Sequence, residues 1–197
     1  MKDIFDHGIM RVVLTAFIFL FAAHEATAPA PDFHLKCVKF RKASAEAVRI
    51  YHRLEFQRFI NDLGYRESLN NWRSVNCIGC FGEWQFAEST IRYLGFRGIT
   101  LRKFRADPDI FPRQLQVGAL ESLIRVNLAL LKDYEHFIGD TVGGVEVTKS
   151  GLIAAAHLGG AGTVKLFLKS GGRINKKDVL KTSVRDYMKR FSGYDLG

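Results

Sequence analysis

Residues 65–86 carry one carboxylate ahead of a glycine-rich connection. The stretch reads YRESLNNWRSVNCIGCFGEWQF, in which Glu67 is followed directly by Ser68. Leu63 and Tyr65 lie close to Glu67 in the sequence, and an apolar neighbourhood disfavours the ionised form of a carboxyl group. A carboxyl group that keeps its proton near neutral pH can serve as a general acid. We therefore expect Glu67 to be a catalytic proton donor.

The residues downstream of Glu67 suit a neutral ligand with many hydroxyl groups. Gly79 and Gly82 allow the backbone to turn tightly or to approach a ligand closely. Gln85 offers both a hydrogen-bond donor and an acceptor. Trp84 and Phe86 offer aromatic faces, which either pack in a core or stack on a sugar ring. For Trp84 both uses remain open.

Apolar residues recur at three- and four-residue steps along most of the chain, which predicts a mainly α domain. Ser183 and Asp186 resemble a capping box before the last helix, and VGGVEVT near 142–148 suggests a hairpin. Pro108 and Pro112 mark a loop. The helices expected are 43–63 ending at Gly64, 84–94 ending at Gly95, 113–138, 151–158 with Ser150 as N-cap, 163–169 and 184–191.

Three cysteines leave several arrangements open. Cys77 and Cys80 form a C-x-x-C pair, and His34 with Cys37 would complete a mixed zinc ligand set. Nothing else in the sequence marks a zinc module, so we expect neither a metal nor a cofactor. In an oxidising compartment, two of the three cysteines could form a structural disulfide, or all could stay free. A thioredoxin-like role is disfavoured because no βαβ pattern surrounds the pair.

The N-terminal 28 residues have the features of a secretory signal peptide. An apolar block from Arg11 to Ala23 follows one positive charge, and it is short for a bilayer span. Ala26-Thr27-Ala28 has the small-x-small form of a cleavage site, so we expect export with cleavage after Ala28. Met10 is an alternative start. A buried core helix or an uncleaved membrane anchor is the alternative interpretation of the block.

The remaining chain is basic and of one-domain size. Residues 29–42, which begin with PAPD, are expected as a stiff linker and N-terminal extension, and residues 43–197 as one domain. Removal of residues 1–28 would leave 27 basic and 17 acidic side chains, a net charge of +10. Nucleic acid, acidic lipid and an anionic cell wall all attract such a charge. Export makes nucleic acid the least favoured partner.

The spacing around Glu67 closely resembles the motif of a known family. Glu67-Ser68 with Gly at +12, Gly at +15 and Gln at +18 matches the E-S … G-x-x-G-x-x-Q signature of the soluble-type lytic transglycosylases (the SLT domain) and goose-type lysozymes. AAHLGGAGTV, residues 155–164, resembles the A-Y-N-A-G-x-G-x-V segment of the same family. Ala156 stands in place of its Tyr, His157 in place of its Asn, and one extra residue separates the glycines.

The resemblance, which spans about residues 45–195, implies a lysozyme-like fold acting on peptidoglycan. The lytic transglycosylases cut the β-1,4 bond between N-acetylmuramic acid and N-acetylglucosamine, and their glutamate acts first as acid and then as base to form a 1,6-anhydro product. This lyase-type reaction needs no cofactor, and we expect the exported chain in the periplasm or cell envelope, or secreted. We expect a monomer that binds glycan strands and envelope assembly or secretion machinery. The expected substrate contacts are Ser68, Gly82, Gln85, Phe86, His157, Gly159 and Tyr194.

Two other functions remain open. Most glycosidases pair two carboxylates, and a hydrolytic muramidase or chitinase-like enzyme would need Glu83 or Glu88, the nearest acids after Glu67, to position water. Glu83 falls where the family motif has no fixed acid, so a one-carboxylate mechanism is favoured. A non-catalytic peptidoglycan-binding protein of the same fold is the second alternative, which the altered segment 155–164 favours.

Overall fold

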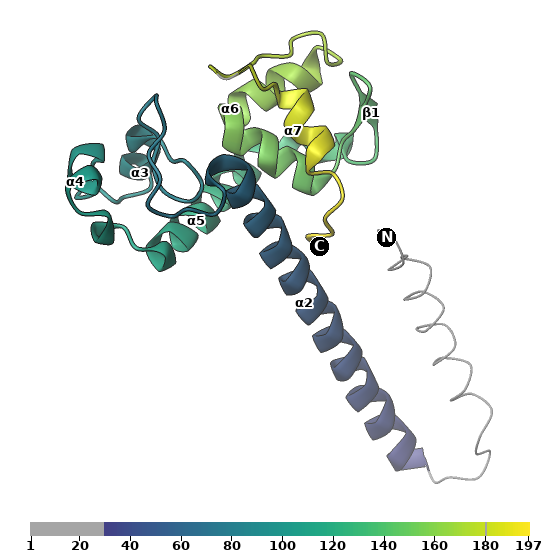
Figure 1. Ribbon diagram of the computed structural model, residues 1–197. Coiled ribbons are helices and arrows are strands. Elements are labelled where there is room, and N and C mark those ends of the chain that lie inside the picture. Colours follow the sequence, from purple (N-terminus) through teal and green to yellow (C-terminus); the bar gives the residue numbers. More distant parts are fainter. Residues whose placement is uncertain (1–29, 180) are drawn as a thin grey trace, which may run out of the picture. The chain divides into compact units, whose positions relative to one another are not determined.

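The computed structural model describes residues 30–179 and 181–197, with side chains from residue 41 onward and at residue 38. The signal peptide expected over residues 1–28 lies outside the described residues, and so does the side chain of Cys37. Helices predominate, and the sheet found in the described ranges has two short strands (Figure 1). The prediction of a mainly α chain is therefore confirmed.

The chain divides between Val48 and Arg49 into two compact units, and the second unit is Arg49–Gly197. Its first helix is the C-terminal part of α2. The elements, in chain order, are α2 (Ala30–Ser68), α3 (Glu88–Tyr93), α4 (Leu101–Ala106), the 3₁₀ helix η1 (Pro108–Ile110), α5 (Arg113–Leu131), the 3₁₀ helix η2 (Lys132–Phe137), β1 (Thr141–Val142), β2 (Val145–Glu146), α6 (Lys149–Lys169) and α7 (Val184–Arg190).

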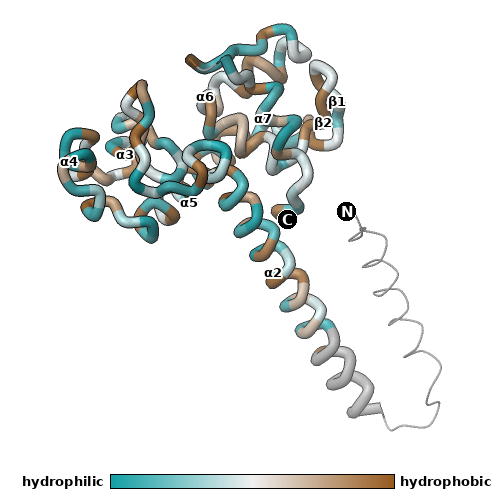
Figure 2. The backbone as a smooth tube through the Cα atoms, in the orientation of Figure 1, coloured by the Kyte–Doolittle hydropathy of each residue, from teal (hydrophilic) through white to brown (hydrophobic). Residues whose placement is uncertain are grey.

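The helix α2 begins earlier than the apolar repeat predicts. It starts at Ala30, so the PAPD segment runs into a helix where a short stiff linker was expected, and the N-terminal extension up to residue 42 is helical. Pro31 does not prevent this, because the first turn of a helix has no partner for its backbone N–H groups and tolerates proline. Hydrophobic and hydrophilic residues alternate along the tube of α2 in Figure 2.

The same helix also ends later than predicted. Gly64 was expected to end it, but the helix continues to Ser68. It stops where Leu69 and Asn70 adopt positive φ angles of 57° and 60°, and the Asn70 N–H donates to the Gly64 carbonyl at 3.2 Å. Gly64 is needed for space instead, since a Cβ there would lie 2.7 Å from Asn70 Oδ1. Glu67 therefore lies in the last turn of a helix, and not beyond its end.

The helix α6 joins two segments that the sequence predicts as separate helices. Thr148 is its N-cap, and its Oγ1 accepts from the Gly151 N–H at 3.0 Å, so the prediction of Ser150 as N-cap is wrong. Ser150 is buried in the first turn. At Gly160 the backbone takes φ 75° and ψ 156°, which is not helical, so α6 consists of two helical segments that meet at a kink. The predicted break between two helices is thus present, although it is only one residue long.

Most of the remaining elements lie close to the ranges predicted from the sequence. The helix predicted over 84–94 is shorter, because α3 begins only at Glu88, so Trp84 and Ala87 precede it. The predicted helix over 113–138 is α5 followed by η2. The expected hairpin is confirmed: β1 and β2 pair antiparallel, with Val142 opposite Val145. The two intervening glycines have φ 60° and 81°, which a two-residue hairpin turn requires.

The core of the second unit lies around α6, which contacts α5, α7 and η2. By length and composition alone α6 could also cross a membrane, but 56% of its most apolar window is buried inside the fold, as in a core helix. Phe59 and Leu63 of α2 are fully buried in the same core. The last turns of α2 are thereby held against the helices that follow.

The capping box at the start of α7 is confirmed, and it carries a stability prediction. The Ser183 Oγ accepts from the Asp186 N–H, and the Asp186 carboxylate accepts from the Ser183 N–H at 2.9 Å. Hydrogen bonds from the Ser183 hydroxyl and backbone lower the pKa of Asp186 below its usual value. A depressed pKa contributes stability above the unfolded pKa, about 3.9, which is lost as pH falls through the folded pKa.

We expect Ser183→Ala to lower the free energy of unfolding by about 1 kcal/mol at pH 7. We also expect the variant to lose less stability than the parent between about pH 5 and pH 2, because its Asp186 pKa lies nearer the unfolded value. Urea unfolding at both pH values measures this difference. Ser192→Ala, just after the same helix, is the matched control and should change little. Equal acid sensitivity of parent and Ser183→Ala would contradict the prediction.

Candidate active site

Glu67 receives a hydrogen bond from a tyrosine of the last helix. Glu67 is half-buried in the last turn of α2, and the hydroxyl of Tyr187 in α7 donates to its Oε1. The Tyr187 side chain is 2% exposed, and burial, followed by the negative charge of Glu67, raises the pKa of Tyr187. Tyr187 therefore stays protonated and holds one oxygen of Glu67, which leaves Oε2 for a ligand.

The two helices that bring this pair together are joined at a second point. The Arg66 guanidinium lies over the Tyr187 ring, 5.9 Å from its centroid, and donates to Thr182 Oγ1 at 3.2 Å. Tyr187 and Met188 lie on the buried face of α7, which fixes the rotation of that helix. The position of Glu67 thus depends on packing between α2 and α7.

Ser68 connects the end of α2 to the glycine-rich connection. Its hydroxyl donates to the Glu83 carbonyl at 2.8 Å, so its role is to anchor the backbone. Phe81 forms isolated antiparallel bridges with Val75 and Phe86, which close the connection into a small loop. Ser68 is therefore a supporting residue beside Glu67, and its hydroxyl is used within the fold where a substrate contact was expected.

The two glycines of the motif are required by the backbone. Gly79 and Gly82 have φ angles of 86° and 85°, in the region that favours glycine. A Cβ on Gly82 would also lie 2.5 Å from Gln116 Oε1. The expected role of Gly82 in binding substrate is therefore replaced by a close approach to α5. Gln116 lies four residues before Leu120 on the apolar stripe of α5. A polar residue on an apolar stripe is the sequence signal that could have identified Gln116.

Gln116 and Arg113 of α5 bind the buried side of the loop through hydrogen bonds and an ion pair. Neither residue was predicted from the sequence. Gln116 accepts from the Glu83 N–H at 2.7 Å and donates to the carbonyls of Trp72 and Phe111 at 2.8 and 2.7 Å. The Glu83 side chain is 0% exposed, and Arg113 donates to both of its oxygens, at 2.6 and 2.9 Å. Glu83 is thus a buried, paired structural acid.

Gln85 and Phe86 take different positions from those expected. Gln85 has a positive φ of 47°, and its Nε2 donates back to the Gly82 carbonyl at 2.7 Å. Its Oε1 is buried with no hydrogen-bond partner in the described part of the chain. Phe86 is 2% exposed and packs against Trp84 and Phe111, so the expectation that its ring contacts substrate is wrong. Phe81, Trp84 and Phe86 of the loop are thus part of the core.

Trp84 and His157 form one buried contact between the loop and α6. Trp84 is fully buried, and its indole N–H donates to the Ile60 carbonyl at 2.8 Å. Of the two uses left open for Trp84, its ring therefore packs in the core and does not face a sugar. His157 Nε2 lies 2.8 Å from the Trp84 carbonyl, and since a carbonyl only accepts, Nε2 carries the hydrogen. His157 Nδ1 is a buried acceptor without a partner among the described residues. Gly159 is exposed near the kink of α6, next to Gly160.

Tyr194, which was expected to contact substrate, has no hydrogen bond to Glu67. Its hydroxyl donates to Asp62 Oδ2 at 2.6 Å, more than one turn earlier on α2. Burial, then the hydrogen bond to Asp62, raises the pKa of Tyr194. The tyrosine that serves Glu67 is Tyr187, because the buried face of α7 points it at the end of α2.

The cysteines of the loop are free. Cys77 is exposed and Cys80 half-buried, with no disulfide between them. Burial raises the pKa of the Cys80 thiol, and the negative charge of Glu67 adds to this. Among the residues that the structure describes, no group of three or more histidine, cysteine or acidic side chains could hold a metal.

Glu67 is thus a partly exposed carboxylate with one oxygen held by a tyrosine, next to a loop anchored by a buried ion pair.

No protein-family model, curated protein or solved structure matches the chain. Chemically, such a carboxyl group can give up and take back a proton through its second oxygen. The other nearby acid, Glu88, is occupied by the Leu101 N–H at 2.8 Å and by Arg92 at 2.9 Å.

Proposed function

We propose that the chain is a peptidoglycan lytic transglycosylase of lysozyme-like fold, exported to the periplasm or cell envelope. The observation that carries the proposal is the contrast between three acids. Glu67 is partly exposed and its Oε2 has no hydrogen-bond partner among the residues that the structure describes, whereas Glu83 and Glu88 have both oxygens engaged in structural contacts. The match of the motif from Glu67 to Gln85 with the family signature supplies the substrate class.

Two steps at Glu67 account for the reaction. The protonated Oε2 first donates its proton to the oxygen of the β-1,4 bond as the bond to the anomeric carbon of the muramoyl unit breaks. The resulting carboxylate then takes the proton of the muramoyl 6-hydroxyl, whose oxygen bonds to that anomeric carbon. Glu67 ends in its starting state, and the product is a 1,6-anhydro sugar. Tyr187 keeps Oε1 occupied throughout, which fixes the orientation of the reacting oxygen.

The hydrolytic alternative requires a second carboxylate that can hold water. Glu83 is 0% exposed and paired with Arg113, so no water can reach it without breaking a buried ion pair. Glu88 caps the first turn of α4 through the Leu101 N–H. Both acids that a muramidase or chitinase-like enzyme could use are therefore engaged in structural contacts. This favours the one-carboxylate mechanism.

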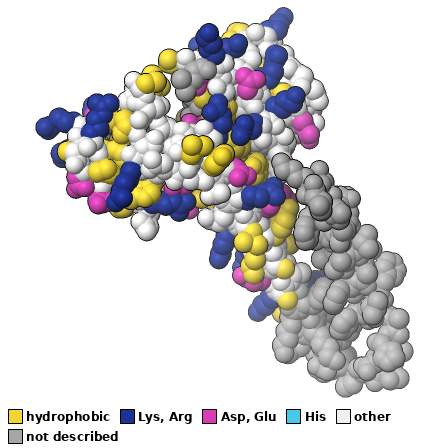
Figure 3. All heavy atoms as spheres, in the orientation of Figure 1, with side chains coloured by type: hydrophobic (Ala, Val, Ile, Leu, Met, Phe, Trp, Pro, Cys, Tyr) yellow, Lys and Arg dark blue, Asp and Glu magenta, His cyan; other side chains and the backbone are white. Residues whose placement is uncertain are grey.

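The surface charge suits an anionic wall polymer. The chain has a formal net charge of +9, and lysine and arginine side chains are spread over the face seen in Figure 3 among hydrophobic and acidic ones. A distributed positive field attracts a polyanion without requiring one fixed docking position. This fits an enzyme that acts along extended glycan strands.

We expect residues 29–197, incubated with purified sacculi, to release anhydro-muropeptides. Mass spectrometry measures this, because the anhydro product is one water lighter than the hydrolysed one. Release of muropeptides with a reducing muramic acid end alone would assign the chain to the hydrolases. Binding to sacculi with no release at all would favour the non-catalytic wall-binding protein.

A further inference from the structure

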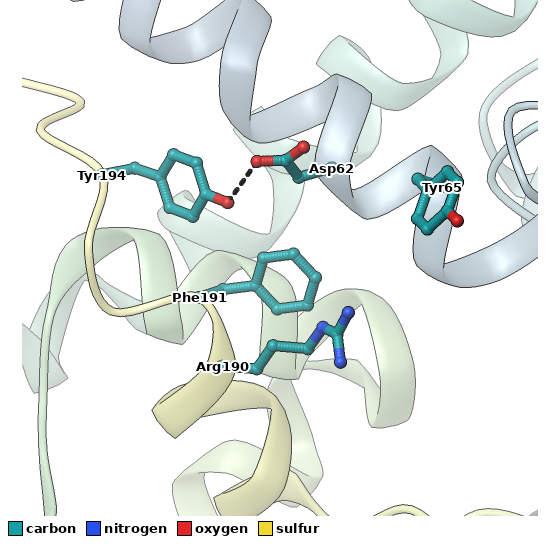
Figure 4. Close-up of a pocket in the computed structure, with 5 residues that line it drawn as sticks. All are labelled: Asp62, Tyr65, Arg190, Phe191 and Tyr194. Carbon is teal, nitrogen blue, oxygen red and sulfur yellow. Dashed lines mark hydrogen bonds between the residues drawn. The ribbon is translucent and has the colours of Figure 1, made fainter. Parts of the chain in front are cut away.

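A pocket of about 220 Å³ lies beside the candidate active site (Figure 4). Its lining comes from α2, from the end of α7 and from the segment after it: Asp62, Tyr65, Arg190, Phe191 and Tyr194. Asp62 and Tyr65 precede Glu67 on α2, and Arg190 follows Tyr187 by three residues on α7. The pocket is thus formed by the same two helices as the Glu67–Tyr187 pair, but it does not include Glu67.

The pocket carries one charge of each sign on opposite walls. Asp62 is held by the Tyr194 hydroxyl through Oδ2, as the dashed line in Figure 4 marks, and it forms no ion pair with any residue that the structure describes. Arg190 extends from α7 in the same view, and over the described ranges it too has no ion pair. The two charges face one space without bridging it. A ligand can therefore satisfy both.

Aromatic rings form the rest of the lining. Tyr65 is 56% exposed, and Phe191 is buried beneath Arg190, whose guanidinium lies 5.9 Å from the ring centroid. The Tyr194 ring is fixed from behind by Phe59, with centroids 5.4 Å apart. Aromatic faces attract an ammonium group, and Tyr65 is the lining ring that has no cation over it among the described residues, since the Arg58 guanidinium lies 4.8 Å from the Tyr194 centroid. A planar guanidinium binds a carboxylate through two parallel hydrogen bonds.

The volume limits the size of the group that the pocket can hold. Pockets for drug-sized molecules are about 300–1,000 Å³, so a partly open space of about 220 Å³ holds one small group, and the rest of a larger ligand would lie outside it. The group must carry an ammonium for Asp62 and a carboxylate for Arg190. An α-amino acid end with both charges on one carbon meets these conditions.

We propose that this pocket binds a zwitterionic α-amino acid group, with Asp62 holding the ammonium and Arg190 the carboxylate. A peptide branch of peptidoglycan that ends in an unlinked diamino acid presents such a group, although this source rests on the proposed function. Cross-linking acylates the ammonium and removes its charge. The pocket would then select strands whose peptides are not cross-linked, close to the bond that Glu67 cleaves.

The test uses the full chain with Glu67→Gln, so that binding is measured without turnover, and 2,6-diaminopimelate as the probe. Isothermal titration should detect binding, with the dissociation constant raised at least about 10-fold by Asp62→Asn and by Arg190→Gln. The amide oxygen that Asp62→Asn introduces can still accept from Tyr194, so this change removes charge with little change of shape. Lys189→Gln removes a neighbouring exposed charge outside the pocket and should leave binding unchanged.

Two derivatives of the probe complete the test. The di-N-acetyl form lacks the ammonium groups and the diamide lacks the carboxylates, so each should bind at least about 10-fold more weakly than diaminopimelate. Equal binding of either derivative, an unchanged affinity in Arg190→Gln, or no binding at about 10 mM probe would overturn the proposal. If diaminopimelate binds as expected but sacculi are never cleaved, the transglycosylase proposal fails and the pocket proposal stands.

Discussion

Glu67→Gln is expected to lower peptidoglycan turnover by about 10²- to 10⁴-fold while binding to sacculi changes little. Glutamine keeps the volume of the side chain, and its Oε1 can still accept from Tyr187, so the packing between α2 and α7 should survive. An amide cannot donate a proton to the leaving oxygen or take one from the 6-hydroxyl. Muropeptide release from sacculi measures the turnover, and circular dichroism checks the fold.

The matched control for this change is Glu88→Gln. Its amide oxygen can still accept from the Leu101 N–H at the start of α4, so the fold should be kept. A one-carboxylate enzyme keeps its activity in this variant, whereas a hydrolase that used Glu88 to hold water would lose a comparable factor. Near-normal release by folded Glu67→Gln protein would show that the acid is elsewhere.

Tyr187→Phe separates positioning from proton transfer. It removes the donor to Glu67 Oε1 but leaves the acid itself, so turnover should fall less than in Glu67→Gln. The ring stays in its buried position in α7, and stability should change by no more than about 0.5–1.5 kcal/mol, the net value of one hydrogen bond.

Arg113→Met is expected to destabilise the fold by about 3–5 kcal/mol, because it leaves the buried Glu83 carboxylate without its partner. Arg113 is itself 47% exposed, so the cost comes from the acid that remains and not from the loss of a surface charge. For a chain of this size about 1 kcal/mol shifts the melting temperature by about 2–4 °C, which makes a drop of about 6–20 °C. Thermal or urea unfolding measures it.

Arg125→Met serves as the control for Arg113→Met. Arg125 pairs with Glu121 on the same helix at 3.2 Å, but both partners are exposed, and such pairs contribute about 0–1 kcal/mol. Adding Glu83→Gln to Arg113→Met should recover part of the loss, since no buried charge then remains. A cost for Arg113→Met no larger than that for Arg125→Met would mean that Glu83 is not buried as an ion in solution.

These contacts also change how Glu83 can be used experimentally. From the sequence, Glu83→Gln is a natural activity control, because it tests the second acid of the motif region. In the structure Glu83 holds Arg113 and lies beside Gly64, where a Cβ would come within 3.0 Å of its Oε1. Replacing it would disturb the loop below Glu67 and confuse stability with chemistry. Glu88 is therefore the better control.

Short-range signals in the sequence determined much of the local structure. The capping box at Ser183 and Asp186 and the hairpin at 141–146 involve residues at most five apart, so the residues that form them are visible together. Helical periodicity likewise predicted α5 and most of α6, because their apolar stripes meet a core. The motif around Glu67 led to the prediction that this residue is the acid, which stays a prediction.

The tertiary structure alone decided what surrounds that residue. Tyr187 reaches Glu67 across 120 residues, and Arg113 reaches Glu83 across 30, so neither pair leaves a local trace. From the sequence, Gly64 predicts the end of a helix. In the structure the helix continues, and a glycine is needed there because a Cβ would collide with Asn70 and Glu83. Phe86 reads as a sugar-stacking ring, but burying it in the core stabilises the fold more than exposure would. Side-chain type and spacing identify candidates, and only long-range packing decides which of them face solvent.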